Sequence, residues 1–272
     1  MSTLKDVAKL AGVSVATASR VLNNNKNVSP ENHHAIMSAM KTLNYTPNYL
    51  GRSLRMSSSK KILVLLPTLS NQFYSRVALG IEDMANAHSY NVMIGSTHGD
   101  RLVEENYINL LFTRLVDGLI LFSTLQSETR LNEIASAYPI VQCCEYKNGV
   151  NASRVIIDNK RAAYDAVRHI IECGHRKIAI IAADDSNYTS RDRTEGYRQA
   201  LAEQDIPILP EYIVHANYSS YTAMRECEAL MQLPEPPTAI FCISDGMAIG
   251  AMRKLSSMGY RICDDVAVVG FD

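Results

Sequence analysis

The residues whose types and spacing most clearly suggest chemistry lie between positions 14 and 23, in the sequence SVATASRVLN. Apolar periodicity predicts a helix there, with Ala18, Val21 and Leu22 on its core face. The opposite face then carries a guanidinium group, small apolar groups and hydroxyls. Arginine binds guanine through two hydrogen bonds, small apolar groups contact the thymine methyl, and hydroxyls bind phosphates. The residues expected to contact DNA here are Ser14, Val15, Ala16, Thr17, Ser19, Arg20 and Asn23.

Three short helices are predicted to hold this surface in place. The first ends at Gly12, which can adopt a left-handed turn, and Ser14 is a favourable N-cap for the second. Ser29-Pro30 begins the third, because proline is well tolerated in the first helical turn. This order predicts a helix-turn-helix over residues 4–23. In such a motif the N-terminal residues of the second helix reach base edges in the major groove.

The charge of the chain is divided in a way that its net value of −1 conceals. Residues 1–60 contain eight Lys or Arg and two acidic residues, a net charge of +6, whereas residues 61–272 carry −7. A basic head on an acidic body favours a polyanion as the partner of the head. The alternative interpretation of residues 14–23 is a helix that only packs on a small core and exposes its other face to solvent. That alternative would explain neither the charge of residues 1–60 nor the outward position of Val15.

Residues 46–60, TPNYLGRSLRMSSSK, differ in character from the head and the body. Pro47 can open a helix over Asn48–Arg55, which would be marginal in isolation because it is short. Such a helix could order on DNA and place Leu54 as an apolar wedge in the minor groove. On local physics alone, an ordinary linker is the simpler interpretation.

From Lys61 onward, apolar runs alternate with helix-like stretches. Runs such as ILVLL and IAIIA are typical of strands buried on both faces, so the alternation predicts parallel sheets flanked by helices. The predicted strands are Ile62–Thr68, Asn91–Ser96, Gly118–Ser123, Ile140–Glu145, Val155–Asp158, Lys177–Ala182, Tyr212–His215, Ala239–Ile243 and Val266–Gly270. The predicted helices are Tyr74–His88, Glu104–Leu115, Arg161–Cys173, Arg193–Glu203, Tyr221–Met231 and Asp245–Met258. No helix is predicted between 140 and 158, which indicates a subdomain boundary near Asp158.

Sequence motifs for catalysis, cofactors or metals are not found. The six cysteines include no CxxC pair and no Cys/His spacing suited to zinc, and the chain has no GxSxG, P-loop or GxGxxG motif. The N-terminus lacks the features of a signal peptide, and no apolar run approaches the roughly 18 residues of a membrane span. We therefore expect a cytoplasmic protein with no catalytic residues, no cofactor, no metal and no membrane partner.

The opening residues, LKDVAKLAGVSVATASRVLN followed by VSPE and LNYTPNYLGRSLR, resemble the LacI/GalR family. The likeness continues through NQFYSRVALGIEDMA, DGLILFS, VIIDN, GHRKIAII, RTEGYRQAL and DVAVVGFD, and covers the whole chain. PEPPTAIFCISDGMAIGA and VIIDNKRAAYDAV most resemble the cytidine-repressor branch. The resemblance implies a transcriptional regulator, most simply a repressor. It would bind a palindromic operator in double-stranded DNA as a homodimer and be switched by a small-molecule effector.

The resemblance also implies a fold. Residues 61–272 would form a two-lobed α/β domain like the type I periplasmic binding proteins, behind the all-α helix-turn-helix head. The expected parts are a DNA-binding domain (1–46), a hinge helix and linker (47–60), and an effector domain with lobes of about 61–158 and 159–272. Members of the family continue beyond the final strand, so we expect the effector domain to be truncated at its C-terminus and poorly stable.

Two sets of contacts follow from the resemblance. The hinge-helix leucine corresponds to Leu54, with Arg55 beside it. The effector would lie between the lobes, at the carboxyl ends of the strands, and the family motifs assign it to Phe73, Tyr74, Ser123, Asp158, Arg193, Tyr218 and Asp272. Aromatic faces stacked on a ring, with Arg and Asp on its polar atoms, suit a nucleoside, a purine or a sugar equally. Phe73 or Tyr74 could instead be core residues, and Asp158 could cap the following helix.

Two other classes of function compete with this interpretation. A solute-binding protein of a transporter would explain residues 61–272, but neither the first 60 residues nor the missing export signal. An enzyme on the same α/β scaffold would need a nucleophile and a base in a recognisable arrangement, which the sequence does not provide.

Overall fold

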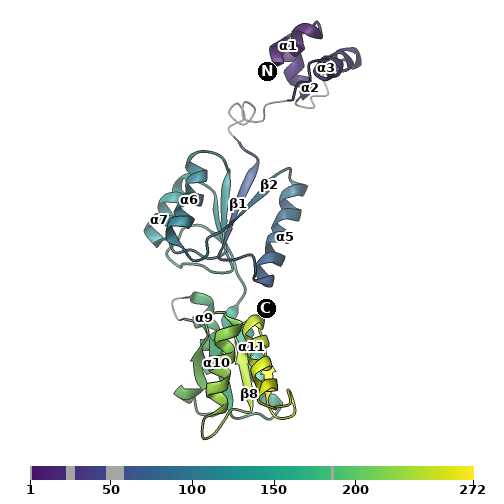
Figure 1. Ribbon diagram of the computed structural model, residues 1–272. Coiled ribbons are helices and arrows are strands. Elements are labelled where there is room, and N and C mark those ends of the chain that lie inside the picture. Colours follow the sequence, from purple (N-terminus) through teal and green to yellow (C-terminus); the bar gives the residue numbers. More distant parts are fainter. Residues whose placement is uncertain (1, 23–27, 47–57, 185–186) are drawn as a thin grey trace. The chain divides into compact units, whose positions relative to one another are not determined.

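A computed structural model describes residues 2–22, 28–46, 58–184 and 187–272. The chain divides into two compact units, Met1–Ser59 and Lys60–Asp272, which are described separately below (Figure 1).

The first unit contains the predicted helix-turn-helix. Its helices are α1 (Leu4–Leu10), α2 (Val15–Leu22) and α3 (Pro30–Thr42). Thr3 and Asp6 form a reciprocal capping box at the start of α1, and Ser29 caps α3. The three helices share one small buried core, made of Val7, Ala8, Ala18, Val21, Ile36 and Ala39. Because all but one of these side chains are Ala or Val, the helices can approach closely.

The second unit begins with a five-stranded parallel sheet in the order β2-β1-β3-β4-β5. Its strands are β1 (Lys61–Leu66), β2 (Asn91–Ser96), β3 (Gly118–Leu121), β4 (Ile140–Cys143) and β5 (Ser153–Val155). The helices between them are α5 (Gln72–Ala87), α6 (Arg101–Phe112) and α7 (Glu128–Ala137), with α5 on one face and α6 and α7 on the other (Figure 1). We call these elements the first lobe.

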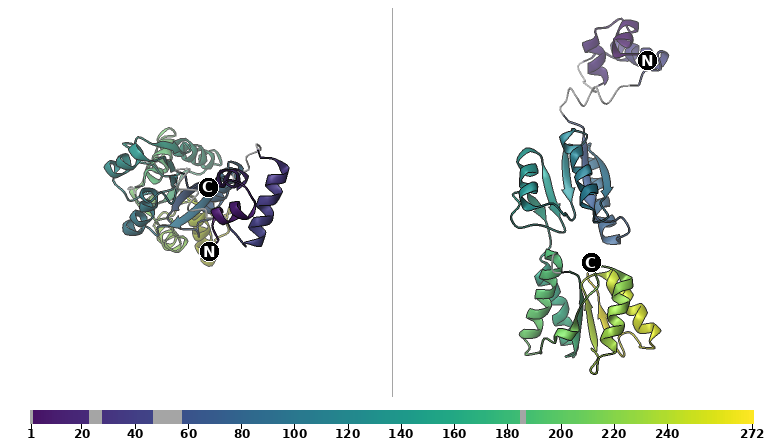
Figure 2. Two further views of the ribbon diagram at one scale, coloured as in Figure 1. Left: turned by 90° about the horizontal axis from the view of Figure 1, so that it is seen from above. Right: turned by 60° about the vertical axis from the view of Figure 1, so that its left-hand side comes forward.

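A four-stranded parallel sheet in the order β7-β6-β8-β9 follows. Its strands are β6 (Ile178–Ala182), β7 (Ile213–His215), β8 (Ala239–Cys242) and β9 (Ala267–Val269). Its helices are α8 (Asn159–Glu172), α9 (Tyr188–Ala202), a 3₁₀ turn (Pro210–Tyr212), α10 (Ser220–Met231) and α11 (Asp245–Ser257). In Figure 2 the pairs α8/α9 and α10/α11 cover opposite faces of this sheet. We call these elements the second lobe.

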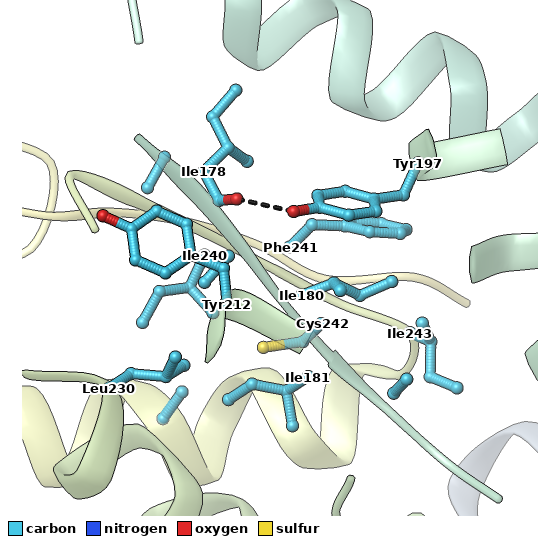
Figure 3. Packing of buried hydrophobic residues seen from close by; sticks show 14 of the residues in the cluster. Ile178, Ile180, Ile181, Tyr197, Tyr212, Leu230, Ile240, Phe241, Cys242 and Ile243 are labelled. Atoms are coloured by element: carbon cyan, nitrogen blue, oxygen red, sulfur yellow. Dashed lines mark hydrogen bonds between the residues drawn. The ribbon is translucent and has the colours of Figure 1, made fainter. Parts of the chain in front are cut away.

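The core of the second lobe lies around β6 and β8, whose residues are all buried (Figure 3). The Tyr197 hydroxyl lies within this core and donates a hydrogen bond to the Ile178 carbonyl at 2.8 Å (Figure 3). Burial against β6 raises the pKa of Tyr197. The apolar runs therefore form strands covered on both faces, as their composition predicts.

Most elements differ from the sequence predictions by a few residues at their ends, and three differences are the most informative. Helix α7 was not predicted, because only Leu131 and Ile134 of its ten residues are buried and its apolar stripe is short. Strand β5 ends at Val155 rather than Asp158, since the next two isoleucines line a cavity instead of pairing in the sheet. Helix α9 begins at Tyr188, five residues before the predicted start, through a turn of polar residues. Among the described residues, no helix combines the length and apolar character needed to cross a membrane.

Helices α8 and α9 pack with no space for a side chain at Gly196. A Cβ atom built there would clash with the backbone carbonyl of Lys160 and lie 2.8 Å from the Tyr164 nitrogen. These neighbours are backbone atoms of a helix, so they cannot rotate away. Gly80 in α5 has no atom within 4 Å of its Cβ position and is exposed.

We predict that Gly196→Ala lowers the free energy of unfolding by about 1–3 kcal/mol, because α8 and α9 must separate to admit the methyl group. The matched Gly80→Ala change should raise it by roughly 0.5–1 kcal/mol, since alanine favours a helix interior. Urea titration followed by circular dichroism measures both. Equal effects of the two changes would contradict the close packing.

Candidate functional site

The outer surface of α2 is the candidate DNA-binding surface of the first unit. Ser14, Val15, Ala16 and Arg20 are exposed, with Val15 at 42%, and Thr17 and Ser19 are partly exposed. The Ser14 hydroxyl accepts a hydrogen bond from the Thr17 backbone nitrogen at 3.1 Å, which fixes the start of the helix as predicted. Asn23, Leu54 and Arg55 lie outside the described residues.

A cavity of about 650 Å³ is the candidate ligand site of the second unit. It is lined from the first lobe by the start of α5 and the segments that follow β4 and β5, and from the second lobe by α8, α9 and the segments that follow β7 and β9. The lining residues are Asn71, Phe73, Tyr74, Val77, Cys143, Cys144, Glu145, Val155, Ile156, Ile157, Asn159, Ala162, Thr189, Arg193, Tyr218, Phe271 and Asp272. The carboxyl ends of parallel strands commonly form such sites.

Arg193 lines this cavity and is fixed by hydrogen bonds, a ring contact and an ion pair. It is 7% exposed, and its Nε donates to Asn159 Oδ1 at 2.8 Å while Nη1 donates to the Ile243 carbonyl at 2.5 Å. Its guanidinium lies 3.7 Å from the centroid of the Phe271 ring and 3.9 Å from an Asp272 carboxylate oxygen. Burial lowers the pKa of Arg193, and the neighbouring Tyr218 and Asp272 oppose that shift.

Two carboxyl groups line the cavity beside this guanidinium. Burial raises the pKa of Asp272 to about 6, with Arg193 drawing it down and Asp245 adding to the rise. Burial likewise raises the pKa of Glu145, although hydrogen bonds from the Thr189 hydroxyl and backbone nitrogen partly stabilise its ionised form. Since Glu145 follows β4 and Thr189 lies in α9, this interaction joins the two lobes.

Both units match families of known proteins. Residues 3–48 match the family of bacterial regulatory proteins, lacI family, and residues 59–272 match the periplasmic binding proteins and sugar binding domain of LacI family. The second match alone covers more than half of the chain. The chain belongs to the LacI family.

Individual members of the LacI family resemble this chain along its whole length. The HTH-type transcriptional repressor CytR of Escherichia coli (strain K12) is 35% identical over 272 residues, 100% of this chain and 80% of that protein. Catabolite control protein A of Priestia megaterium is 33% identical, over 99% of this chain and 82% of that protein. The likeness to the cytidine-repressor branch is therefore confirmed, and the relatives are transcriptional regulators.

Solved structures confirm the predicted fold class. The Lac repressor dimer bound to operator and the anti-inducer ONPF matches with a TM-score of 0.88 at 26% identity, over 100% of this chain and 82% of that chain. The transcriptional regulator CelR in complex with cellobiose matches with a TM-score of 0.70 at 28% identity, over 99% and 82%. This LacI-family chain thus combines a helix-turn-helix head with a periplasmic-binding-like domain.

The structure brings five of the seven residues assigned by family motifs to the cavity, namely Phe73, Tyr74, Arg193, Tyr218 and Asp272. Ser123 and Asp158 are not among its lining residues. Asp158 instead caps α8, where its Oδ1 accepts from the Arg161 nitrogen at 2.9 Å, and it lines a separate shallow hollow beside Tyr164. Ser123 follows the buried Phe122 at the end of β3.

Several lining residues were not predicted from the sequence. Glu145 ends a predicted strand and Phe271 precedes Asp272 in the GFD motif, so strand ends were the available signal. Asn159 directly follows the predicted strand Val155–Asp158 and so carried the same signal. Thr189 carried no such signal, because its role depends on Glu145, a partner far away in the chain. Within the part of the chain that the structure describes, no cluster of His, Cys, Asp or Glu could hold a metal ion.

Proposed function

We propose that this chain is a transcriptional repressor that binds a near-palindromic operator as a homodimer. A small molecule in the cavity between the lobes would change its operator affinity. The proposal rests on one observation above all: an exposed α2 surface and a cavity lined by fixed polar groups occur in the same chain. Binding at the second site can alter the first only through different affinities for two conformations of the protein.

The parts of the chain would divide this work. Residues 1–46 would read the major groove, and 61–272 would respond to the effector. Residues 47–60 would act as a hinge helix and linker, with Leu54 in the minor groove and Arg55 beside it. We further propose that the protein acts in the cytoplasm, where its operator lies, and has no catalytic activity, in keeping with relatives that are regulators.

The chemistry of the cavity favours a nucleoside as effector. Phe73, Tyr74 and Phe271 supply aromatic faces, and Ile156 and Ile157 extend the apolar wall. Two carboxyl groups against one guanidinium favour a ligand rich in N–H or O–H donors. A heteroaromatic base with exocyclic N–H groups meets both requirements, whereas a sugar would leave much of the apolar wall without a partner.

We predict that Arg20→Ala relaxes base preference at one position in each half-site, at a cost of about 1–3 kcal/mol for the preferred sequence. Selection from randomised duplexes first defines the operator, and anisotropy titrations then compare single-base variants. The control is Lys41→Ala, which removes an exposed basic side chain from α3 and should leave the order of base preferences unchanged. Equal weakening of Arg20→Ala on every sequence would make Arg20 a phosphate contact, and selection of a site without two half-sites would contradict the dimer.

We predict that effector affinity falls with acidity below about pH 6, the pKa of Asp272. A ligand N–H needs the ionised carboxylate as acceptor, so affinity should fall by up to about tenfold per pH unit below this value. Calorimetry from pH 8 to pH 5 with a panel of cytidine, adenosine, uridine and ribose tests this. Asp272→Asn should flatten the profile, leaving only the contribution of Glu145. An identical slope in the wild type and this variant would contradict the role of Asp272.

A further inference from the structure

Two adjacent cysteines, Cys143 and Cys144, both line the cavity at the end of β4. Their sulfur atoms lie 3.7 Å apart, and Cys143 is 8% exposed as a whole residue. The other four cysteines differ in their surroundings, since Cys227 and Cys242 are buried in the core of the second lobe and Cys173 and Cys263 are exposed. Among the described cysteines, only the adjacent pair therefore combines a neighbouring thiol with a lining position in this cavity.

The backbone holds the pair in an uncommon conformation. Cys144 has a φ of 71°, a left-handed value that a non-glycine residue rarely adopts. Hydrogen bonds fix this turn: the Cys144 nitrogen donates to the Val155 carbonyl at 3.1 Å, and the Glu145 nitrogen donates to the carbonyls of Phe122 and Cys143 at 3.1 and 2.9 Å. Such strained residues persist where the surrounding structure fixes them, and they concentrate at functional sites.

The two thiols are electrostatically unequal. The two sulfur atoms lie within hydrogen-bond distance of one another, where either thiol can donate, and this contact lowers the pKa of Cys143 and raises that of Cys144. The burial of Cys144 and the nearby Glu145 add to the rise at Cys144. Because the thiolate is the nucleophile in disulfide exchange, the lowered pKa favours Cys143 as the attacking residue and Cys144 as the second one, an order that the single variants below test.

We propose that Cys143 and Cys144 form a thiol–disulfide modification site within the cavity, with a low-molecular-weight disulfide as its oxidant. The Cys143 thiolate attacks one sulfur of that disulfide, forming a mixed disulfide and releasing one small thiolate, which takes up the proton that Cys143 lost. The Cys144 sulfur then attacks the Cys143 sulfur, forms the Cys143–Cys144 bond and releases the second small thiol with the Cys144 proton. Two protein thiols are oxidised, and one disulfide is reduced to two thiols.

The product would be readily reversible. Adjacent residues hold their Cα atoms about 3.8 Å apart, whereas disulfides usually span about 4.4–6.8 Å. A bond closed over this shorter distance is easily reduced, as is typical of regulatory rather than structural disulfides. Oxidation also changes the shape of the cavity wall, and so, if the cavity binds the effector as proposed above, it links effector binding to the redox state.

The test uses the full chain with Cys173→Ser and Cys263→Ser, which removes the two exposed thiols. The protein is incubated with 2-hydroxyethyl disulfide, quenched with acid, alkylated and digested with trypsin. The peptide 131–147, which follows Arg130 and ends at Lys147, contains Cys143 and Cys144 and no other cysteine. We expect this peptide to lose two hydrogen atoms and to carry no alkyl group.

Single variants assign the two roles. Adding Cys144→Ser should trap the mixed disulfide on Cys143, and adding Cys143→Ser should slow modification of the peptide at least tenfold. In urea this difference between the two variants should vanish, because it arises from the fold. The proposal is overturned if the peptide carries two alkyl groups under conditions that modify Cys173 of the parent chain. The readout needs neither operator nor effector, so its failure leaves the proposed function untouched.

Discussion

The cavity wall of the second lobe depends on the burial of one guanidinium group. Removing Arg193 from water is unfavourable unless its N–H groups find partners. Two of them donate to Asn159 and to the Ile243 carbonyl, and the Phe271 ring stacks on the guanidinium plane. These partners belong to the start of α8, the end of β8 and the segment after β9. Arg193 therefore fixes three separate chain segments at the carboxyl edge of the sheet, where the cavity wall forms.

Helix α9, which contains Arg193, also contacts the first lobe. Thr189, one turn before Arg193, donates to Glu145, and Asp192 accepts from the Tyr146 hydroxyl at 3.2 Å, beside a contact between the Tyr146 and Tyr188 rings. A ligand that displaces Arg193 thus acts on the helix that also contacts the segment after β4. If the cavity binds the effector as proposed, these contacts are the route by which its occupancy would change the arrangement of the two lobes.

The sequence predicted the elements well, because their signals are local. Gly12, Ser14 and Ser29-Pro30 mark helix boundaries that depend only on nearby backbone, and the buried runs of β1 and β6 are recognisable from composition. Helix α7 was not predicted because it buries only two side chains. The family motifs correctly predicted that Arg193 and Asp272 line the cavity. Glu145 and Thr189 were not predicted, because their interaction forms only when the fold brings together a strand end and a helix start that are 44 positions apart. For Asp158 the family motif predicted a place in the cavity, whereas its local sequence also allowed it to cap the next helix. In the structure it caps α8.

The most direct test of the role of Arg193 is the operator affinity of Arg193→Lys, measured by anisotropy with and without saturating cytidine or whichever member of the nucleoside and ribose panel binds. Lysine keeps the charge but cannot maintain both fixed hydrogen bonds. The exposed Arg198 on the same helix supplies the matched control, Arg198→Lys. We predict that Arg193→Lys retains ligand-free operator affinity and loses the ligand response, whereas the control retains both. A full ligand response in Arg193→Lys would contradict this role.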